Sequence, residues 1–356
     1  MKRNLRTIAA VTISAAGLLT LGLPAATAAP AVPAGAAAAV SAASAAPATV
    51  TASAADPVVR MATYNICKKA CGKGKFSWAH RRLALVRTVD SVRPDVLAIQ
   101  EANTQVWNGI RHIDDVVNLL GSIGYQISST NYENCTLGCT RGAHVFYNPA
   151  RMHIAALPNP AVAVGMTGLS TIAQTPFGGV QDRAVSWAFL SRNESDRVTM
   201  YVSVHLPTEK SAFSESLRVA IAANLRGWAN GIIQASGVAA DLVVAGDFNS
   251  YARRQPFGAQ QVLSTSGALI DGYAAPVKVN ANFGTVNMAP KIKKYKGFPP
   301  RPYYYAKTDP ARIDYIFSTA APLRWEVVLR LTSNGKFDNA YRASDHNMVV
   351  VDLPLA

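Results

Sequence analysis

Short apolar runs that end on polar residues recur along the chain and predict a protein built around β-strands. Residues 241–246 (DLVVAG) form a short, β-branched run closed by a glycine, which is typical of a buried strand. Residues 198–205 instead alternate apolar and polar side chains, which predicts a strand with one buried face. The same kinds of pattern predict further strands at 58–65, 95–100, 143–147, 184–190, 312–318, 325–331 and 347–353.

Helical spacing of apolar residues occurs in three segments between these strands. Residues 79–92 carry such a pattern, and Pro94 ends it. Residues 214–234 carry another, and residues 257–264 a weaker one. Because the helices interrupt the strands without alternating regularly with them, we expect an α/β fold in which two packed sheets are flanked by helices, rather than a doubly wound parallel sheet.

The N-terminal part of the chain differs in composition from the rest. Basic residues precede an apolar stretch, and Ala26, Thr27 and Ala28 are the small residues that a signal peptidase reads. Residues 1–28 are therefore predicted to be a signal peptide, with an uncleaved anchor helix as the alternative. Residues 29–56, rich in Ala, Pro, Val, Ser and Thr, predict a linker or pro-segment. Residues 57–356 would form one folded domain of a secreted, extracellular protein.

The charge balance is strongly basic. Lys and Arg number 35 against 21 Asp and Glu, a formal net charge of +14. Loss of Lys2, Arg3 and Arg6 with the signal peptide would leave a net charge of +11. Such a surface favours polyanionic partners, either nucleic acid or anionic lipid, although it also serves solubility.

The four cysteines form two local pairs, Cys67 with Cys71 and Cys135 with Cys139. An exported protein meets an oxidising environment, so the spacing favours a disulfide within each pair. A four-cysteine zinc site is the alternative. Each disulfide would close only a short ring, and we expect it to stiffen a loop more than to stabilise the whole fold.

Polar residues stand at the ends of several predicted strands. Any one of them could cap a turn or pair with an arginine. Residues that follow buried strands gather at the edge of a sheet, however, and a rigid frame of this kind can hold an active site. The residues concerned are Asn65, Glu101, His205, Asp247, Asn249, Asp345 and His346, together with Asp314 inside the run 312–318.

These residue types suit the cleavage of a phosphoester. Glu101 and an aspartate could hold a divalent ion, since Mg²⁺ prefers oxygen ligands. His205 and His346 could activate water and protonate the leaving oxygen. Asp314 could orient the His346 ring and stabilise its cationic form. The remaining histidines are interpreted as surface or structural residues: His80, His112, His144 and His153.

Six short motifs follow one another in an order that is known from one family. They are TYN at Asn65, QE at Glu101, a strand ending in His205, GDFN at Asp247 and Asn249, RIDYIF at Asp314, and SDH at Asp345 and His346. With these motifs the chain resembles the endonuclease/exonuclease/phosphatase superfamily, which has the fold of pancreatic-type deoxyribonuclease, and looks like a secreted bacterial member. The resemblance spans nearly the whole folded domain. It implies a four-layer α/β sandwich and a metal-dependent phosphoric ester hydrolase.

The resemblance also assigns roles by position. It implies that Glu101 is the principal ligand of the metal, with Asn65 and Asp345 nearby, and that the metal is Mg²⁺, with Mn²⁺ or Ca²⁺ as alternatives. Asp247 and Asn249 would orient the nucleophilic water and the scissile phosphate.

Three further roles follow from the same resemblance. His346 would be the general base or a phosphate-stabilising group supported by Asp314, and His205 an acid or electrostatic partner. Arg183, in QDRAVSW, resembles an arginine that contacts phosphate, with a structural ion pair as the alternative. The glutamate that usually partners His205 in the family is not identified in the sequence.

The substrate class depends on features outside these motifs. His205 resembles the histidine of deoxyribonuclease-like, sphingomyelinase-like and inositol-phosphatase-like members. Residues 291–307 combine basic residues, which offset backbone phosphates, with aromatic rings, which stack on bases. We therefore expect a monomeric nuclease acting on DNA or RNA, without an obligate protein partner. The alternatives are a lipid phosphodiesterase, a small-molecule phosphatase and a non-catalytic binding module.

Overall fold

The computed structural model describes residues 58–129, 142–174, 183–208, 212–251, 258–265, 269–287, 298–302, 304 and 312–355. The predicted signal peptide and linker lie outside these residues, as do Cys135, Cys139 and most of the basic aromatic segment 291–307. Within the described ranges, no helix combines the length and the apolar character needed to cross a membrane.

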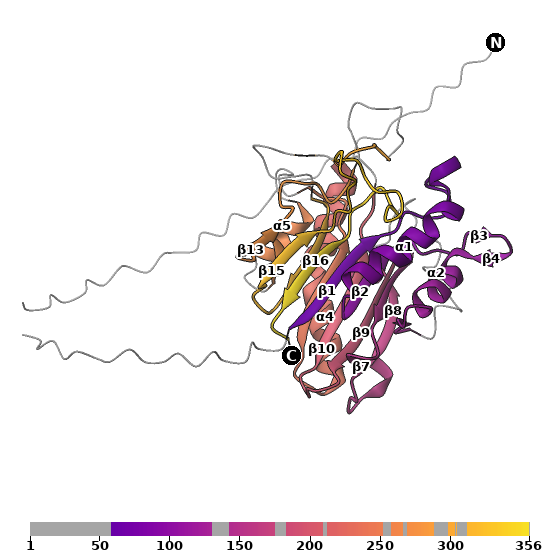
Figure 1. Cartoon of the computed structure of the whole chain (residues 1–356). Helices are drawn as coiled ribbons and strands as arrows, with labels where there is room; N and C mark the ends of the chain where they lie inside the picture. The colour runs from indigo at the N-terminus through magenta and orange to yellow at the C-terminus, as the bar shows by residue number, and fades with distance from the viewer. Residues whose placement is uncertain are drawn as a thin grey trace, which may run out of the picture. The chain divides into compact units, whose positions relative to one another are not determined.

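Two seven-stranded sheets form the centre of the molecule (Figure 1). In the first sheet, β1 runs parallel to β2 and antiparallel to β16. Its strands are, in sheet order, β13 (Val277–Val279), β15 (Arg324–Val327), β16 (Val349–Leu353), β1 (Val59–Asn65), β2 (Val96–Gln100), β6 (Ala143–Tyr147) and β5 (Gln126–Ile127).

The second sheet has parallel strands β10 and β11 at its centre, with β14 antiparallel to β11. Its strands are, in sheet order, β12 (Ile270–Asp271), β14 (Asp314–Ser318), β11 (Asp241–Asp247), β10 (Thr199–His205), β9 (Ala184–Arg192) and β7 (Met152–Ile154), with β8 (Val164–Gly168) also paired to β9. A small separate hairpin joins β3 (Val106–Trp107) to β4 (Ile110–Arg111).

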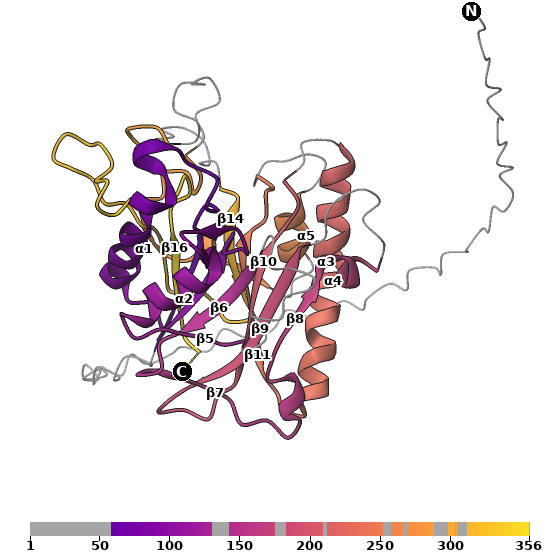
Figure 2. The same ribbon diagram turned by 90° about the vertical axis from the view of Figure 1, so that its right-hand side faces the viewer.

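Helices cover the outer face of each sheet (Figure 2). The first sheet carries α1 (Trp78–Val92) and α2 (His112–Gly121), and the second carries α3 (Leu169–Ala173), α4 (Ala212–Ser236) and α5 (Ala259–Thr265). Three apolar cores result: one under each helical layer and one between the sheets. The predicted two-sheet, four-layer sandwich is confirmed. Short 3₁₀ turns add η1 (Gly74–Phe76), η4 (Pro160–Val162) and η5 (Gly272–Ala274).

Strand β10 is more buried than its alternating pattern predicts. All seven of its residues are buried, because the second sheet has helix α4 on one side and the first sheet on the other. Of its polar side chains, Ser203 is hydrogen-bonded inside the sandwich, where its Oγ accepts from Gln100 Nε2 at 3.2 Å. The prediction of a half-buried strand is therefore wrong.

Other elements also differ from the sequence-based expectation, and several short ones were not predicted: α3, β3, β4, β5, β7, β8, β12 and β13. The strand predicted at 325–331 ends at Val327, and Leu331 forms only an isolated bridge with Phe337. Helix α2 was not predicted, although Asp114 and Asp115 in its first turn are a signal of a helix start.

Candidate active site

Three predicted site residues form a row across the second sheet. His205 and Asp247 end the parallel strands β10 and β11 and are register partners. Asp314 begins β14 and is the register partner of Asp247 on the other side. Because paired residues on neighbouring strands project to the same side, the register itself brings the three side chains together.

His346, from the loop before β16, lies beside this row of three residues. Its Nδ1 lies 2.9 Å from Asp314 Oδ2, and its Nε2 lies 3.8 Å from Asp247 Oδ2. On the other side of Asp247, His205 Nε2 lies 3.3 Å from the same Oδ2 atom. One carboxylate oxygen thus lies between two imidazole rings.

The first sheet adds Asn65 and Glu101, which lie at the ends of neighbouring strands β1 and β2. Asn65 Nδ2 donates to Asp247 Oδ2 at 2.9 Å and to Glu101 Oε1 at 3.4 Å, so one amide links the two sheets. Asn65 Oδ1 accepts from the Cys67 N–H. In this arrangement Asn65 directs its nitrogen, rather than its oxygen, toward the carboxylates.

Three non-glycine residues around the site have left-handed backbone angles. The φ angle is 59° at Cys67, 68° at Glu101 and 49° at Asn249. Such conformations cost on the order of 1–3 kcal/mol and cluster at functional sites, because the surrounding structure must enforce them. The Lys68 N–H also donates to Glu101 Oε2 at 2.7 Å and so orients the side chain of this residue.

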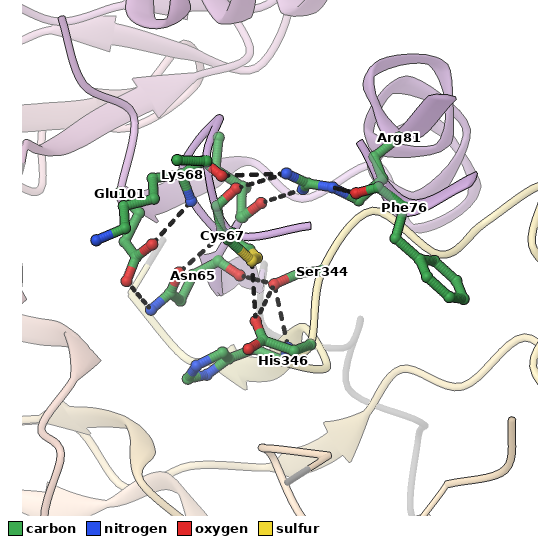
Figure 3. The surroundings of a disulfide bond; sticks show 12 residues. Asn65, Cys67, Lys68, Phe76, Arg81, Glu101, Ser344 and His346 are labelled. Carbon is green, nitrogen blue, oxygen red and sulfur yellow. Dashed lines mark hydrogen bonds between the residues drawn. A yellow bond between two sulfur atoms is a disulfide. The ribbon is translucent and has the colours of Figure 1, made fainter. Parts of the chain in front are cut away.

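The Cys67–Cys71 disulfide that the spacing predicts is present next to these residues (Figure 3). It closes the loop whose N–H groups, at Cys67 and Lys68, bind Asn65 and Glu101. Cys71 Sγ lies 4.0 Å from Asp345 Oδ1 on the opposite loop. The disulfide therefore restrains the backbone donors that orient two candidate site residues.

Arg81 of α1 is a structural part of the site that the sequence analysis missed. Its buried guanidinium donates to the carbonyl groups of Phe76, Ile66, Cys67, Lys68 and Ala343 (Figure 3). It thereby ties the loop after β1 to the loop that carries His346. The available signal was its spacing: Arg81 shares the buried face of α1 with Leu85 and Val89, an unusual place for an arginine.

Asn249 and Arg183 meet at one carbonyl group. Leu206 O accepts from Asn249 Nδ2 at 2.9 Å and from Arg183 Nη1 at 2.6 Å, and Arg183 Nη2 also bonds Thr208 Oγ1. The Asn249 N–H donates to Asp247 Oδ1. Arg183 thus holds the chain that follows His205, and its contact with phosphate stays a prediction.

Burial and neighbouring charges set the protonation states of the two aspartates of the row and of His346. Burial favours neutral Asp247, but His205, His346 and Asn65 together hold the pKa of Asp247 below its usual value. Burial raises the pKa of Asp314 to about 6. Burial opposes charge on His346, yet Asp314 and Asp247 raise the pKa of His346 well above its usual value. At neutral pH, His346 is therefore a cation between two carboxylates.

His205 has the opposite character. Burial and the nearby charge of Arg183 lower the pKa of His205, so its ring is neutral at pH 7. Its Nδ1 has no hydrogen-bond partner among the residues that the structure describes. The family's usual glutamate partner is thus not seen at this atom within those residues.

The donor set fits a divalent cation. Asp247, Asp314 and His346 each have one possible ligand atom within 4.8 Å of the others, and all three are buried. A histidine binds a metal only as the neutral ring, so His346 would have to lose a proton to join such a site. Glu101 is joined to Asp247 through Asn65, and the nearby His205 and the Lys68 N–H hold the pKa of Glu101 below its usual value, against burial. Two ionised carboxylates this close to each other suit a hard metal ion.

Comparisons with known proteins bear on the family and on the fold. The sequence profile of the Endonuclease/Exonuclease/phosphatase family matches residues 62–346. No curated protein sequence matches the chain.

Solved structures show the same fold. A member of that family from Bacteroides thetaiotaomicron has 18% identity and a TM-score of 0.60, with 83% of this chain and 95% of that chain covered. A mannosyl-6-phosphatase from the same organism has 18% identity and a TM-score of 0.59, with 82% and 98% covered. The human Nocturnin catalytic domain, bound to sulfate, has 21% identity and a TM-score of 0.52, with 83% and 93% covered.

The match to the family profile runs from β1 to His346 and includes every motif described above. Members of this family are hydrolases that typically depend on a metal ion, and this chain has a buried group, Asp247, Asp314 and His346, that could hold one. The chain belongs to the endonuclease/exonuclease/phosphatase family.

Proposed function

We propose that the protein is a secreted, metal-dependent phosphodiesterase that hydrolyses DNA or RNA as a monomer. The observation that carries the phosphodiesterase part is the row His205–Asp247–Asp314, with His346 bound to Asp314. The net charge of +14 supports a polyanionic substrate. Anionic lipid is the other partner that this charge would favour.

The protonation states suggest a division of roles. Ionised Asp247 can accept the proton of an attacking water, while Asn249 orients that water or the phosphate. Cationic His346 can donate a hydrogen bond to a phosphoryl oxygen and stabilise the charge that develops there. Mg²⁺, Mn²⁺ or Ca²⁺, held by Glu101 with Asp345 and Asp247 nearby, would neutralise charge on the phosphoryl oxygens when bound.

A substrate panel tests this proposal. The purified protein is incubated with DNA, RNA, sphingomyelin and an inositol phosphate, with Mg²⁺ or with EDTA. We expect cleavage of nucleic acid that EDTA abolishes. Hydrolysis of sphingomyelin or the inositol phosphate, with nucleic acid intact, would replace the nuclease by a lipid phosphodiesterase or a phosphatase. No metal-dependent turnover of any substrate would favour a binding module.

A pair of histidine variants ties the activity to the site. His346→Ala should lower turnover by about 10²–10³, the effect of removing one donor that stabilises the charge developing in the transition state. His153→Ala is the matched control, since His153 is exposed and lies outside the row. Equal activity of the two variants would contradict the site assignment.

The predicted signal peptide is tested separately by the N-terminal sequence of protein from culture medium, which should begin at Ala29.

A further inference from the structure

A cavity of about 260 Å³ lies near the disulfide loop and is not part of the proposed catalytic row. Three of its lining residues are aromatic and three are cationic, and none of those that the structure describes is acidic. The lining residues are Lys75, Phe76, Phe298, Pro300, Lys336, Phe337, Asn339 and Arg342. Cations and aromatic faces together are the surface that single-stranded nucleic acid binds.

Arg342 is the central group of this cavity. Its guanidinium carbon lies 4.6 Å from the ring centre of Phe337, 5.0 Å from that of Phe76 and 5.2 Å from that of Phe298. The residue is 6% exposed, and its Nε and Nη2 atoms have no hydrogen-bond partner among the described residues. A buried cation with unsatisfied donors is costly, and a phosphate could satisfy those donors.

Two of the aromatic rings are stacked on each other beside this cation. Phe76 and Phe298 stack with ring centres 4.7 Å apart and an angle of 13° between their planes. Lys75 Nζ lies 5.3 Å from the centre of the Phe76 ring. The volume falls just short of the roughly 300–1,000 Å³ of pockets that hold whole ligands, so the cavity suits one part of a larger substrate.

The cavity is connected to the active site through two elements. Arg342 lies in the loop that carries Asp345 and His346. Arg81 lies 5.8 Å from the centre of the Phe298 ring and donates to the Cys67 carbonyl group. Figure 3 shows Phe76 and Arg81 across the Cys67 loop from Glu101 and His346. A strand bound at the catalytic row could therefore continue toward the cavity.

We propose that this cavity is a subsite for a nucleotide that flanks the scissile bond of a nucleic acid strand. Arg342 binds the phosphate of that nucleotide, and the partly exposed ring of Phe76, backed by the buried rings of Phe298 and Phe337, packs against its base. Lys75 and Lys336, which are exposed, add charge at the entrance. This inference rests on the proposed nuclease function for its substrate, but its binding step can be measured without catalysis.

Binding is measured with a labelled single-stranded oligonucleotide in EDTA, where turnover does not interfere. We expect Arg342→Gln to weaken affinity about tenfold and Lys336→Ala to weaken it less. Each should lower the steepness of the salt dependence by about 0.7, the value for one lost phosphate contact on a single strand. Lys278→Ala is the matched control, because Lys278 does not line the cavity. Its Nζ lies 5.1 Å from the ring centre of Tyr273.

Catalysis is compared on the oligonucleotide and on bis(4-nitrophenyl) phosphate, which has one phosphate and no flanking nucleotide. Arg342→Gln should lower kcat/KM on the oligonucleotide at least tenfold and leave that on the small diester within twofold. Equal loss on both substrates would mean that Arg342 only supports the fold, and the subsite would be overturned. Unchanged values on both would overturn it as well.

The two proposals fail in different ways. If the wild type cleaves the small diester but neither DNA nor RNA, the nuclease function fails. The binding measurement in EDTA is then the only test of the nucleotide subsite. The subsite is overturned if wild-type binding is undetectable or if the wild type and Arg342→Gln bind with equal affinity. If the variant weakens binding of inorganic phosphate but not of the oligonucleotide, the cavity is a site for a free anion and the nucleotide subsite is wrong.

Discussion

At the scale of single residues, Asp314 acts on His346 through both a hydrogen bond and a negative charge. Asp314→Asn keeps the shape and removes the charge. Because Asp314 raises the pKa of His346, we expect that pKa to fall, and the high-pH limb of the kcat/KM profile to move to lower pH. Turnover should fall by about 10²–10⁴. A pH–rate series on bis(4-nitrophenyl) phosphate measures both effects, and an unshifted profile would contradict the assigned pair.

Gly246 is a second residue whose role can be isolated. A Cβ atom there would lie 1.9 Å from the Val204 carbonyl oxygen on the paired strand β10. That oxygen is a backbone atom, so Gly246→Ala must disturb the register that places His205 beside Asp247. We expect a loss of about 3 kcal/mol or more in the free energy of unfolding, measured with urea.

The control for this change is another glycine. Gly227 lies in α4 with no atom within 4 Å of its added Cβ. Gly227→Ala should raise the free energy of unfolding by about 0.5–1 kcal/mol, since alanine favours a helix interior. Similar effects of the two substitutions would show that packing against β10 does not explain the glycine at 246.

At the scale of elements, the loop between β1 and α1 determines how Glu101 and Asn65 are held. The double change of Cys67→Ser and Cys71→Ser removes its disulfide and leaves Cys135 and Cys139 unchanged. We expect activity to fall about tenfold, because the Cys67 and Lys68 N–H groups lose their fixed positions. Stability should fall by no more than about 2 kcal/mol, since the closed ring is short. Full activity with a large loss of stability would assign the disulfide to the fold instead.

The same elements show what a sequence pattern can predict here. Strands β1, β2, β6 and β11 have apolar runs with polar or glycine ends, and their positions are predicted within a residue or two. Strands of two or three residues, such as β5 and β12, are too short to show periodicity. The alternation in β10 indicates which side chains share a face, but not that a second sheet covers the polar face.

The candidate site likewise contains some residues that the sequence predicts and others that it does not. Side chains at strand ends were predictable because topology brings such ends to one edge, and Asn65, Asp247 and Asp314 do meet there. The contacts of Arg81 were not predictable in this way. They join carbonyl groups on two connections, between β1 and α1 and before β16, and the positions of these connections depend on packing between elements that are distant in sequence.

At the scale of the whole molecule, the active site lies where the two sheets meet, so its geometry depends on the sandwich staying closed. Asn65 from one sheet and Asp247 from the other are joined by a hydrogen bond of 2.9 Å. Any condition that loosens the packing should therefore separate the candidate metal ligand Glu101 from the His205–Asp247–Asp314 row. Acid is such a condition, because two histidines are buried within the first sheet and its helical layer.

Burial lowers the pKa of His112 to about 3 and that of His144 to about 4. In the unfolded chain both pKa values return to about 6.5, so below that pH the unfolded state binds more protons than the folded one. Stability is therefore fully present above pH 6.5 and is lost as pH falls from about 6.5 toward 4. Each ring contributes up to about 1.4 kcal/mol per pH unit in this window. Urea unfolding between pH 7.5 and 4.5 should show this slope. His144→Gln should reduce it and His80→Gln, at an exposed position, should not; equal slopes in all three proteins would contradict the assignment.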